Sequence, residues 1–327
     1  MRHTTFRQME IFSAIARLKS FTRAAEELHL TQPTASMQMK KLEDTVGLPL
    51  VEQIGKRIFL TGAGNALHST CREIFDSLDR FEMLIADMKG MKKGYLRIGV
   101  VTTAKYFAPR LLGPFCQKYP GVDISLKVTN RERVLERIAE NLDDVYIMGQ
   151  PPENLEIYSE PFLSNPLVAL AARDHPLAGK RRISLKRFVE EPLILREPGS
   201  GTRIAFERLL KMHNFTPRIR MELGSNEAIK QAVAGGLGVA VLSKHTLALE
   251  GHASEPIILN VQHLPIARHW HVAYAKDKRL SVIAETFLEY LREAGADLER
   301  KNGGAPIAAS SLKRLQGGRK SAPGGLA

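Results

Sequence analysis

Three arginines stand near hydroxyl groups and glycines in segments that follow predicted strands. Ligands of α/β sheets bind beyond the carboxyl ends of the strands, where helices begin. Guanidinium groups bind phosphate or carboxylate oxygens in two-pronged fashion, and glycines let backbone amides approach an anion closely. Gln150 closes a further strand and could line the same cleft. The residues predicted to bind an anion are Thr102, Thr103, Ala104, Asn130, Arg131, Gln150, Arg196, Gly201, Thr202 and Arg203.

The same residue types also have ordinary explanations. Most arginines are solvated, and residues 199–201 could form only a turn. The glycine-rich run at 235–238 follows a predicted helix, which is the reverse of the order in a nucleotide-binding loop. His269 and His271 share a strand face without a third ligand at suitable spacing, so no metal site is predicted. Sequence motifs of hydrolases and zinc proteases do not occur, so no catalytic residue is assigned.

The first sixty residues predict a DNA-binding domain. Apolar residues recur at helical spacing over 6–18, a short helix is predicted over 22–28, and a third helix follows its N-cap at residue 31. Two short helices joined this tightly are typical of a helix-turn-helix, and residues 49–60 predict a hairpin with a basic tip. A solvated helix face is the alternative. The residues predicted to contact DNA are Ser20, Thr22, Arg23, Thr31, Gln32, Pro33, Ser36, Gln38, Lys40, Lys56 and Arg57.

A long helix is predicted over residues 63–89, and its apolar residues recur at alternating spacings of four and three. This narrow heptad stripe favours pairing with a second helix, although a helix buried on its own domain would also carry apolar residues. A helix-turn-helix protein also needs two copies to bind two half-sites. The predicted dimer seam consists of Leu67, Cys71, Ile74, Leu78, Phe81, Ile85 and Met88.

Ordered segments of these residues resemble the LysR-type transcriptional regulators. The segments are SFTRAA at 20–25, LTQPTAS at 30–36, KLE at 41–43, VG at 46–47 and LTGAG at 60–64. Within that family, the wing at 52–57 and the segments at 130–132, 148–152 and 196–203 are similar to regulators of the RuBisCO (Calvin-cycle) operons of autotrophic bacteria. Met37 departs from the pattern because many relatives carry arginine there, which puts one phosphate or base contact in question.

Beyond residue 94, predicted strands and helices alternate, which implies a parallel α/β sheet in each of two lobes. Strands are predicted at 95–101, 122–128 and 145–148, and helices at 106–118 and 131–140. The resemblance implies a periplasmic-binding-protein-like effector domain, in which crossovers near Pro161 and Pro265 form a hinge over a cleft.

The predicted fold class is therefore an α+β multidomain chain. It has a winged helix-turn-helix at 1–62, a coiled-coil linker helix with a hinge at 63–94, and a two-lobed α/β effector domain at 95–300. Lobe I is expected at 95–161 and 266–300, and lobe II at 162–265.

Composition agrees with a cytoplasmic, nucleic-acid-binding protein. The chain has 47 Lys and Arg against 35 Asp and Glu, and the net charge of +12 favours polyanions. Residues 301–327 are basic and rich in Gly, Ala, Ser and Pro, which predicts a disordered tail. No apolar run could span a membrane, and no signal peptide is predicted. Cys71 and Cys116 are expected to be buried thiols in a reducing compartment.

Together these features predict a DNA-binding transcriptional regulator that activates a carbon-fixation operon. The resemblance implies an effector that is a phosphorylated sugar, phosphoenolpyruvate or an NADPH-like nucleotide, and no cofactor is expected. The expected partners are double-stranded promoter DNA, a second copy of the chain in a dimer or tetramer, and RNA polymerase. Effector binding would change lobe closure and so the angle between paired DNA-binding domains. The alternatives are a regulator of another operon with a different anionic effector and a cytosolic solute-sensing module without operator preference; an enzyme is the least favoured.

Overall fold

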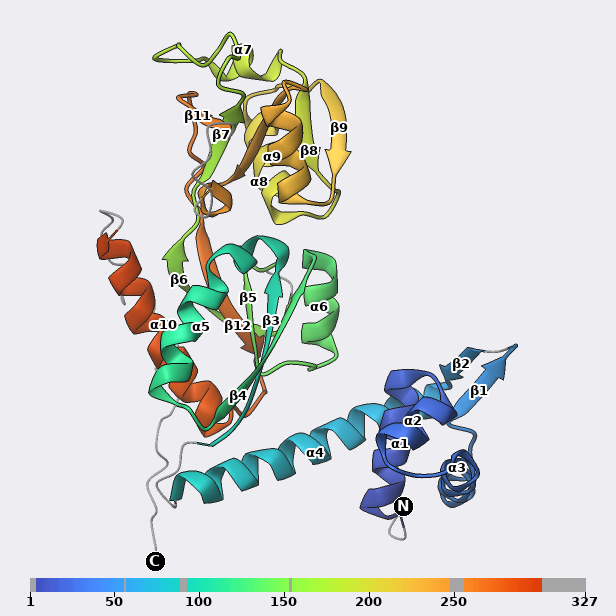
Figure 1. Cartoon of the computed structure of the whole chain (residues 1–327). Coiled ribbons are helices and arrows are strands. Elements are labelled where there is room, and N and C mark those ends of the chain that lie inside the picture. Colours follow the sequence, from blue (N-terminus) through green and yellow to red (C-terminus); the bar gives the residue numbers. More distant parts are fainter. Residues whose placement is uncertain (1–3, 56, 89–92, 153–154, 248–255, 302–327) are drawn as a thin grey trace, which may run out of the picture. The chain divides into compact units, whose positions relative to one another are not determined.

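The computed structural model describes residues 4–55, 57–88, 93–152, 155–247 and 256–301, in two compact units that divide after residue 89 (Figure 1). Predictions for Lys56 and for the tail at 302–327 fall outside these residues. None of the described helices is long and apolar enough to cross a membrane.

The N-terminal unit packs three helices and a hairpin around the start of a long helix. Thr5 and Gln8 form a capping box, and the hydroxyls of Ser20 and Thr31 cap the next two helices. Gly47 ends the third helix with φ of 78°, a conformation that favours glycine. The predicted helix-turn-helix and wing are thus present. The elements are α1 (Phe6–Leu18), α2 (Phe21–Glu27), α3 (Gln32–Val46), β1 (Val51–Ile54), β2 (Arg57–Leu60) and α4 (Gly62–Met88).

Lobe I of the C-terminal unit is a five-stranded sheet in the order β4-β3-β5-β12-β6. Helices α5 and α10 cover one face, and α6 covers the other (Figure 1). Strand β3 runs parallel to β4 and β5, whereas β12 runs antiparallel to β5 and β6. Its elements are β3 (Gly94–Val101), η1 (Thr102–Tyr106), α5 (Ala108–Lys118), β4 (Val122–Thr129), α6 (Arg131–Ala139), β5 (Val145–Met148), β6 (Ile157–Ser164), β12 (His269–Ala275) and α10 (Val282–Lys301).

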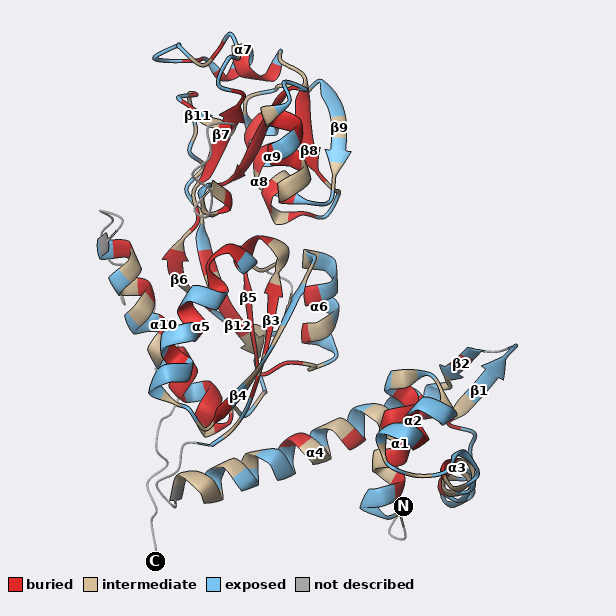
Figure 2. Ribbon diagram, in the orientation of Figure 1, coloured by how far each residue is buried: buried red, intermediate tan, exposed pale blue. Residues whose placement is uncertain are grey.

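Lobe II is a second five-stranded sheet in the order β11-β7-β10-β8-β9. Residues of β7 alternate between two cores, one formed with α7 and α8 and the other with α9. Strands β7, β8 and β10 are buried along their whole length (Figure 2). Its elements are β7 (Leu167–Ala171), α7 (Leu185–Val189), β8 (Leu193–Arg196), α8 (Gly201–Met212), β9 (Ile219–Leu223), α9 (Asn226–Ala234), β10 (Val239–Ser243), η2 (Lys244–Leu247) and β11 (Ile257–Leu259).

Several predictions about the C-terminal unit were wrong. Both sheets are mixed rather than parallel, because β12 and β7 pair antiparallel to their neighbours where the chain passes between the lobes. Pro161 lies inside β6, not at a crossover; β6 is an edge strand, where a residue without an N–H is tolerated. The predicted helix at 106–118 is present as α5, which begins two residues later, at Ala108, after the short helix η1 ends at Tyr106. Cys71 is buried as expected, but Cys116 is exposed.

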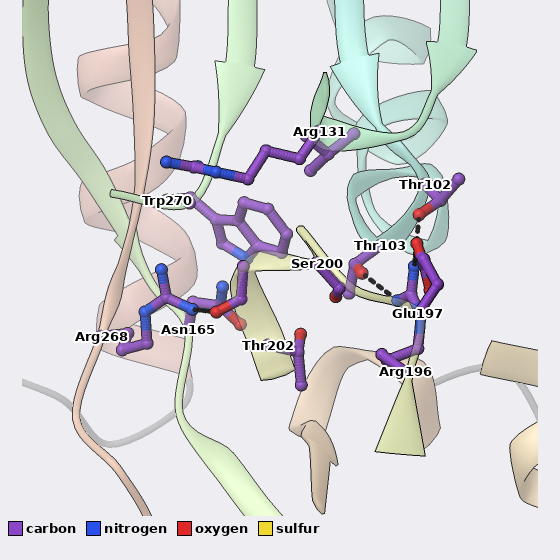
Figure 3. Close-up of a pocket in the computed structure, with 13 residues that line it drawn as sticks. Thr102, Thr103, Arg131, Asn165, Arg196, Glu197, Ser200, Thr202, Arg268 and Trp270 are labelled. Carbon is purple, nitrogen blue, oxygen red and sulfur yellow. Dashed lines mark hydrogen bonds and ion pairs between the residues drawn. The ribbon is translucent and has the colours of Figure 1, made fainter. Parts of the chain in front are cut away.

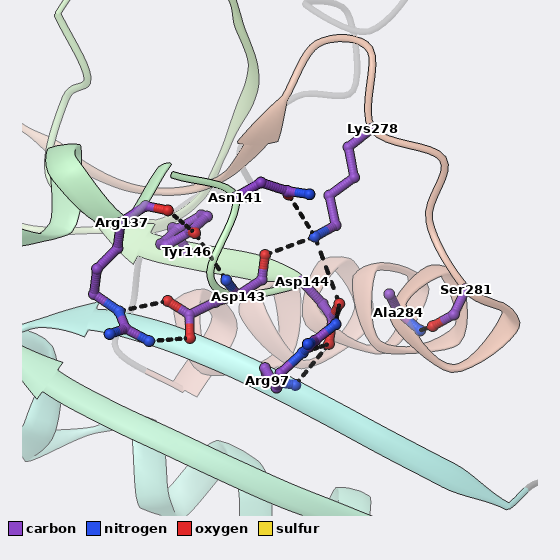
Figure 4. A network of polar contacts seen from close by, with 9 residues as sticks. All are labelled: Arg97, Arg137, Asn141, Asp143, Asp144, Tyr146, Lys278, Ser281 and Ala284. Atoms are coloured by element: carbon purple, nitrogen blue, oxygen red, sulfur yellow. Dashed lines mark hydrogen bonds and ion pairs between the residues drawn. The ribbon is translucent and has the colours of Figure 1, made fainter. Parts of the chain in front are cut away.

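A buried polar network holds α6 and β5 in place in lobe I (Figure 4). The Arg137 guanidinium donates to both carboxylate oxygens of Asp143, at 2.8 and 2.6 Å. The backbone amide of Arg97 donates to Asp144 at 2.8 Å, and Lys278 Nζ donates to the carbonyl of Asp143 at 2.8 Å. The Arg97 guanidinium also pairs with Asp144 at 3.2 Å, so both carboxylates have a cationic partner, as buried charges require. Because α6 begins and β5 ends at the pocket described below, the network fixes part of its wall.

Candidate effector pocket and DNA-binding surface

A pocket lies between the two lobes, beyond the carboxyl ends of β3, β5, β6 and β8 (Figure 3). It encloses about 30 Å³, which is room for about two water molecules. Of the residues predicted to bind an anion, Thr102, Thr103, Arg131, Arg196, Gly201 and Thr202 line it. The sequence did not single out the other lining residues, which are Val101, Gly149, Asn165, Glu197, Ser200, Arg268 and Trp270.

Two arginines give this pocket an excess of positive charge. Arg131 donates to the carbonyl of Gln150 at 3.1 Å, and Arg268 donates to the carbonyl of Gly201 at 2.6 Å. Burial lowers the pKa of Arg131, and burial together with the charges of Arg131 and Arg208 lowers the pKa of Arg268 to about 10. Both side chains therefore stay protonated at neutral pH. Neither forms an ion pair with a carboxylate within the described part of the chain, so an anion between them would remove an unfavourable charge imbalance.

The N-terminus of α8 adds backbone donors to the same pocket. Ser200 is the N-cap of this helix, but its hydroxyl makes no capping hydrogen bond. Gly201 and Thr202 form the first turn, whose amides have no partner within the helix itself. The positive end of the helix dipole and these amides favour a bound anion beside Arg131 and Arg268.

Arg196 has a structural role that its sequence position did not reveal. The side chain is buried, and its guanidinium donates to both oxygens of Glu197 at 2.7 and 2.8 Å and to Asn226 Oδ1 at 2.6 Å. It also donates across to lobe I, to Thr102 Oγ1 at 3.2 Å and Thr103 Oγ1 at 3.5 Å. Its donors are thus already used, and the predicted free anion clamp is wrong for this residue. Arg196 instead joins the two lobes at the pocket floor.

Four other predicted residues lie outside the pocket lining. Arg203 Nη1 pairs with Glu222 at 2.8 Å, because this position of α8 faces β9 rather than the pocket. The Asn130 side chain caps α6 by accepting from the Arg133 amide at 2.9 Å. Gln150 contributes only its carbonyl, to Arg131, and Ala104 is buried within η1. The predicted loops therefore meet at the pocket, whereas these four side chains do not line it.

Most of the predicted DNA-contacting residues are exposed on the N-terminal unit. Gln32 is exposed at the start of α3, and its amide donates to Ser36 Oγ at 3.0 Å. One amide hydrogen and the carbonyl oxygen remain for a base edge. The exposed residues of the predicted set are Thr22, Arg23, Thr31, Gln32, Pro33, Lys40 and Arg57, while Ser20, Ser36 and Gln38 are half-buried.

The predicted dimer seam on α4 divides into two parts. Leu67 and Cys71 are buried in the core of their own domain against α1, so their assignment to a helix–helix seam is wrong. Burial raises the pKa of the Cys71 thiol, which keeps it neutral. Farther along, the exposed fractions of Leu78 and Phe81 are 42% and 60%. Ile74 and Ile85 are half-buried, and the side chain of Met88 lies outside the described residues. The second half of the stripe is therefore the part available for pairing.

Comparison with known proteins gives two family matches that together cover most of the chain. Residues 6–65 match the bacterial regulatory helix-turn-helix proteins of the lysR family, and residues 89–296 match the LysR substrate binding domain. The second match alone covers more than half of the sequence.

Individual relatives match over nearly their whole length. The HTH-type transcriptional activator CmpR of Synechocystis is 53% identical over 89% of this chain and 96% of its own. The RuBisCO operon transcriptional regulator of Acidithiobacillus ferrooxidans is 50% identical over 91% and 97%. Among solved structures, the Synechocystis CcmR regulatory domain in complex with 2-PG is 54% identical, with a TM-score of 0.61, and covers 63% of this chain and 99% of that domain.

Proposed function

The chain belongs to the LysR family of bacterial transcriptional regulators, and we propose that it activates a carbon-fixation operon in response to a small phosphorylated acid. Relatives at 50% and 53% identity are a RuBisCO operon regulator and a transcriptional activator. The observation that carries the effector class is the pair Arg131 and Arg268, two half-buried cations that line the pocket without a carboxylate partner among the described residues.

The effector that fits this charge is a compact dianion such as 2-phosphoglycolate. A CcmR domain 54% identical to this chain was solved with 2-PG bound, and one phosphate with one carboxylate would match two guanidinium groups and a helix N-terminus. The described cavity of about 30 Å³ is too small for such a molecule. Binding therefore requires the lobes or lining side chains to rearrange, which gives the ligand-bound and ligand-free states different conformations.

The DNA interface of this function is the exposed side of α3 together with the hairpin β1–β2. Gln32 would read a base edge in the major groove, while Thr31 and Arg57 would contact phosphates. Two copies paired through the exposed residues of α4, Leu78 and Phe81, would present two such helices to successive half-sites. The active assembly is a cytoplasmic dimer or tetramer that contacts RNA polymerase at the promoter.

The proposal is tested by a DNA-binding titration at fixed ionic strength, because phosphate contacts make affinity depend strongly on salt. The full chain is titrated onto its own upstream intergenic DNA and onto scrambled DNA, each with and without 2-phosphoglycolate, ribulose bisphosphate, phosphoenolpyruvate or NADPH. The proposal predicts preference for the upstream DNA that one phosphorylated ligand changes. Equal affinity for both DNAs under every ligand would contradict it and would favour a solute-sensing module.

A further inference from the structure

Trp270 is the only tryptophan in the sequence and lies in the wall of the effector pocket. It belongs to β12, the strand that returns to lobe I, and its exposed fraction is 1%. Its ring packs against Phe107 with centroids 5.0 Å apart and against His245 at 6.2 Å. Figure 3 shows the indole among the labelled lining residues of the pocket, including Arg131 and Arg268. Its position is thus fixed by packing on one side, while it borders the cavity on the other.

The indole Nε1 of Trp270 is a buried donor that has no acceptor among the described residues. Buried polar groups are almost always hydrogen-bonded, and a donor left without a partner costs free energy. The pairing of β12 with β6 also changes register between Trp270 and His271. Such bulges turn a side chain away from its regular direction and are common beside binding sites. An unpaired donor beside a pocket therefore indicates that the occupant supplies the acceptor.

We propose that Nε1–H of Trp270 donates a hydrogen bond to an anionic oxygen of the effector, which makes Trp270 a binding and specificity-determining residue. The assignment rests on the proposed function, because it names a further contact to the same phosphorylated acid. Arg131 and Arg268 supply charge to the ligand, and Trp270 supplies a directed donor on a rigid ring. A ligand with two anionic ends is favoured over inorganic phosphate, which has only one, because it can reach both kinds of donor.

The first test uses the wild-type protein, because a single tryptophan gives a single indole N–H signal in a ¹H–¹⁵N spectrum of the full chain labelled with ¹⁵N-tryptophan. Titration with 2-phosphoglycolate is expected to move the indole proton downfield as the hydrogen bond forms, in step with binding measured by calorimetry. Inorganic phosphate should move it less. An indole signal that stays in place while calorimetry shows saturation overturns the assignment.

The second test removes the donor. Trp270→Phe keeps an aromatic ring against Phe107 but has no N–H, and loss of a hydrogen bond to a charged group should weaken 2-phosphoglycolate binding by roughly 10- to 100-fold. Since the smaller ring leaves a cavity, a second variant replaces Trp270 biosynthetically by benzothienylalanine, which has the indole shape with sulfur in place of N–H. Thermal unfolding followed by circular dichroism checks that each variant is folded.

The outcomes separate this assignment from the proposed function. Wild-type protein that binds 2-phosphoglycolate, together with two variants of unchanged affinity, overturns the role of Trp270 and leaves the proposed function in place. If wild-type protein binds no 2-phosphoglycolate, the proposed effector is contradicted. The indole signal is then followed during titration with inorganic phosphate and with phosphoenolpyruvate. A signal that neither anion moves overturns the donor role of Trp270 as well.

Discussion

Replacing Arg268 by methionine is expected to remove a binding group without destabilising the fold. Methionine keeps much of the aliphatic stem but carries no charge. Arg268 is largely buried, has the like charges of Arg131 and Arg208 nearby, and donates to the carbonyl of Gly201. The charge of Arg268 therefore destabilises the fold when the pocket is empty and strengthens ligand binding when an anion occupies the pocket.

The magnitude follows from the pKa of Arg268, which burial and neighbouring charge lower from 12.5 to about 10. The lowered pKa means that folding disfavours the charged form of Arg268 by about 3 kcal/mol, because each pKa unit is worth about 1.4 kcal/mol. Since the folded-state pKa is the lower one, this cost is present at neutral pH and is relieved only as pH rises through about 10. Loss of the bond to Gly201 offsets about 1 kcal/mol, so Arg268→Met should be more stable by roughly 1–2 kcal/mol.

The assay combines urea unfolding without ligand and calorimetric titration with 2-phosphoglycolate. Arg268→Met should gain stability and lose affinity by roughly 10- to 150-fold, the value of a charge-assisted hydrogen bond. The matched control is Arg203→Met, because Arg203 is partnered by Glu207 and Glu222 and lies outside the pocket lining. That control should lose stability and keep its affinity for the ligand. An Arg268→Met protein that is less stable than wild type and binds 2-phosphoglycolate equally well would show that Arg268 is a structural residue and not a ligand-binding one.

Further predictions concern DNA binding, dimerisation and pH. Gln32→Ala should make the free energy of binding to operator DNA less favourable by roughly 1–3 kcal/mol and relax base preference, whereas Arg57→Ala should weaken binding to all sequences and flatten the salt dependence. Fluorescence anisotropy at several salt concentrations measures both effects. Equal losses of affinity for Gln32→Ala on operator and random DNA would contradict base reading by Gln32. Phe81→Asp should shift the assembly toward smaller species in analytical ultracentrifugation, because a charge would enter the exposed apolar stripe of α4. An unchanged assembly would show that the α4 stripes of two copies do not pair. Hydrogen bonds from Tyr106 and Lys105 hold the pKa of the Glu227 carboxyl at about 2 despite its partial burial. The ionised carboxylate should therefore stabilise the fold above pH 4.5, and this stabilisation should be lost as pH falls toward 2. The melting temperature of Glu227→Gln should fall less at acid pH than that of wild type, and an identical fall would argue against this contact.

Local signals in the sequence were enough to predict the elements that carry the site. Thr31 before Pro33 marks the start of α3, and a hydroxyl N-cap acts within one helical turn, so no distant residue is needed to recognise it. The loops after β3, β4 and β8 were also identifiable, because strand ends and following glycines are local features. These elements position Thr102, Arg131 and Gly201 at the pocket.

The remaining features depend on contacts between residues far apart in the chain. Arg268 and Trp270 reach the pocket because β12 returns to lobe I beside β5 and β6; the family resemblance implied that return, but no periodicity near residue 270 indicates which side chains it brings to the pocket. Arg196 has the residue type of an anion clamp, but its partners Asn226 and Thr102 are 30 and 94 positions away. Whether an arginine is free or already paired is thus a property of tertiary structure.

If a small dianion bound at Arg131 and Arg268 controls operator affinity, the operator and the dianion must affect each other's binding. Operator affinity is measured with and without saturating 2-phosphoglycolate, and 2-phosphoglycolate affinity is measured with and without saturating operator DNA. Coupling between two sites is reciprocal, so both affinities should change by the same factor, and both changes should disappear in the double variant Arg131→Gln, Arg268→Gln. An operator affinity that 2-phosphoglycolate leaves unchanged, or a double variant that still responds, would show that a dianion at Arg131 and Arg268 does not control operator binding.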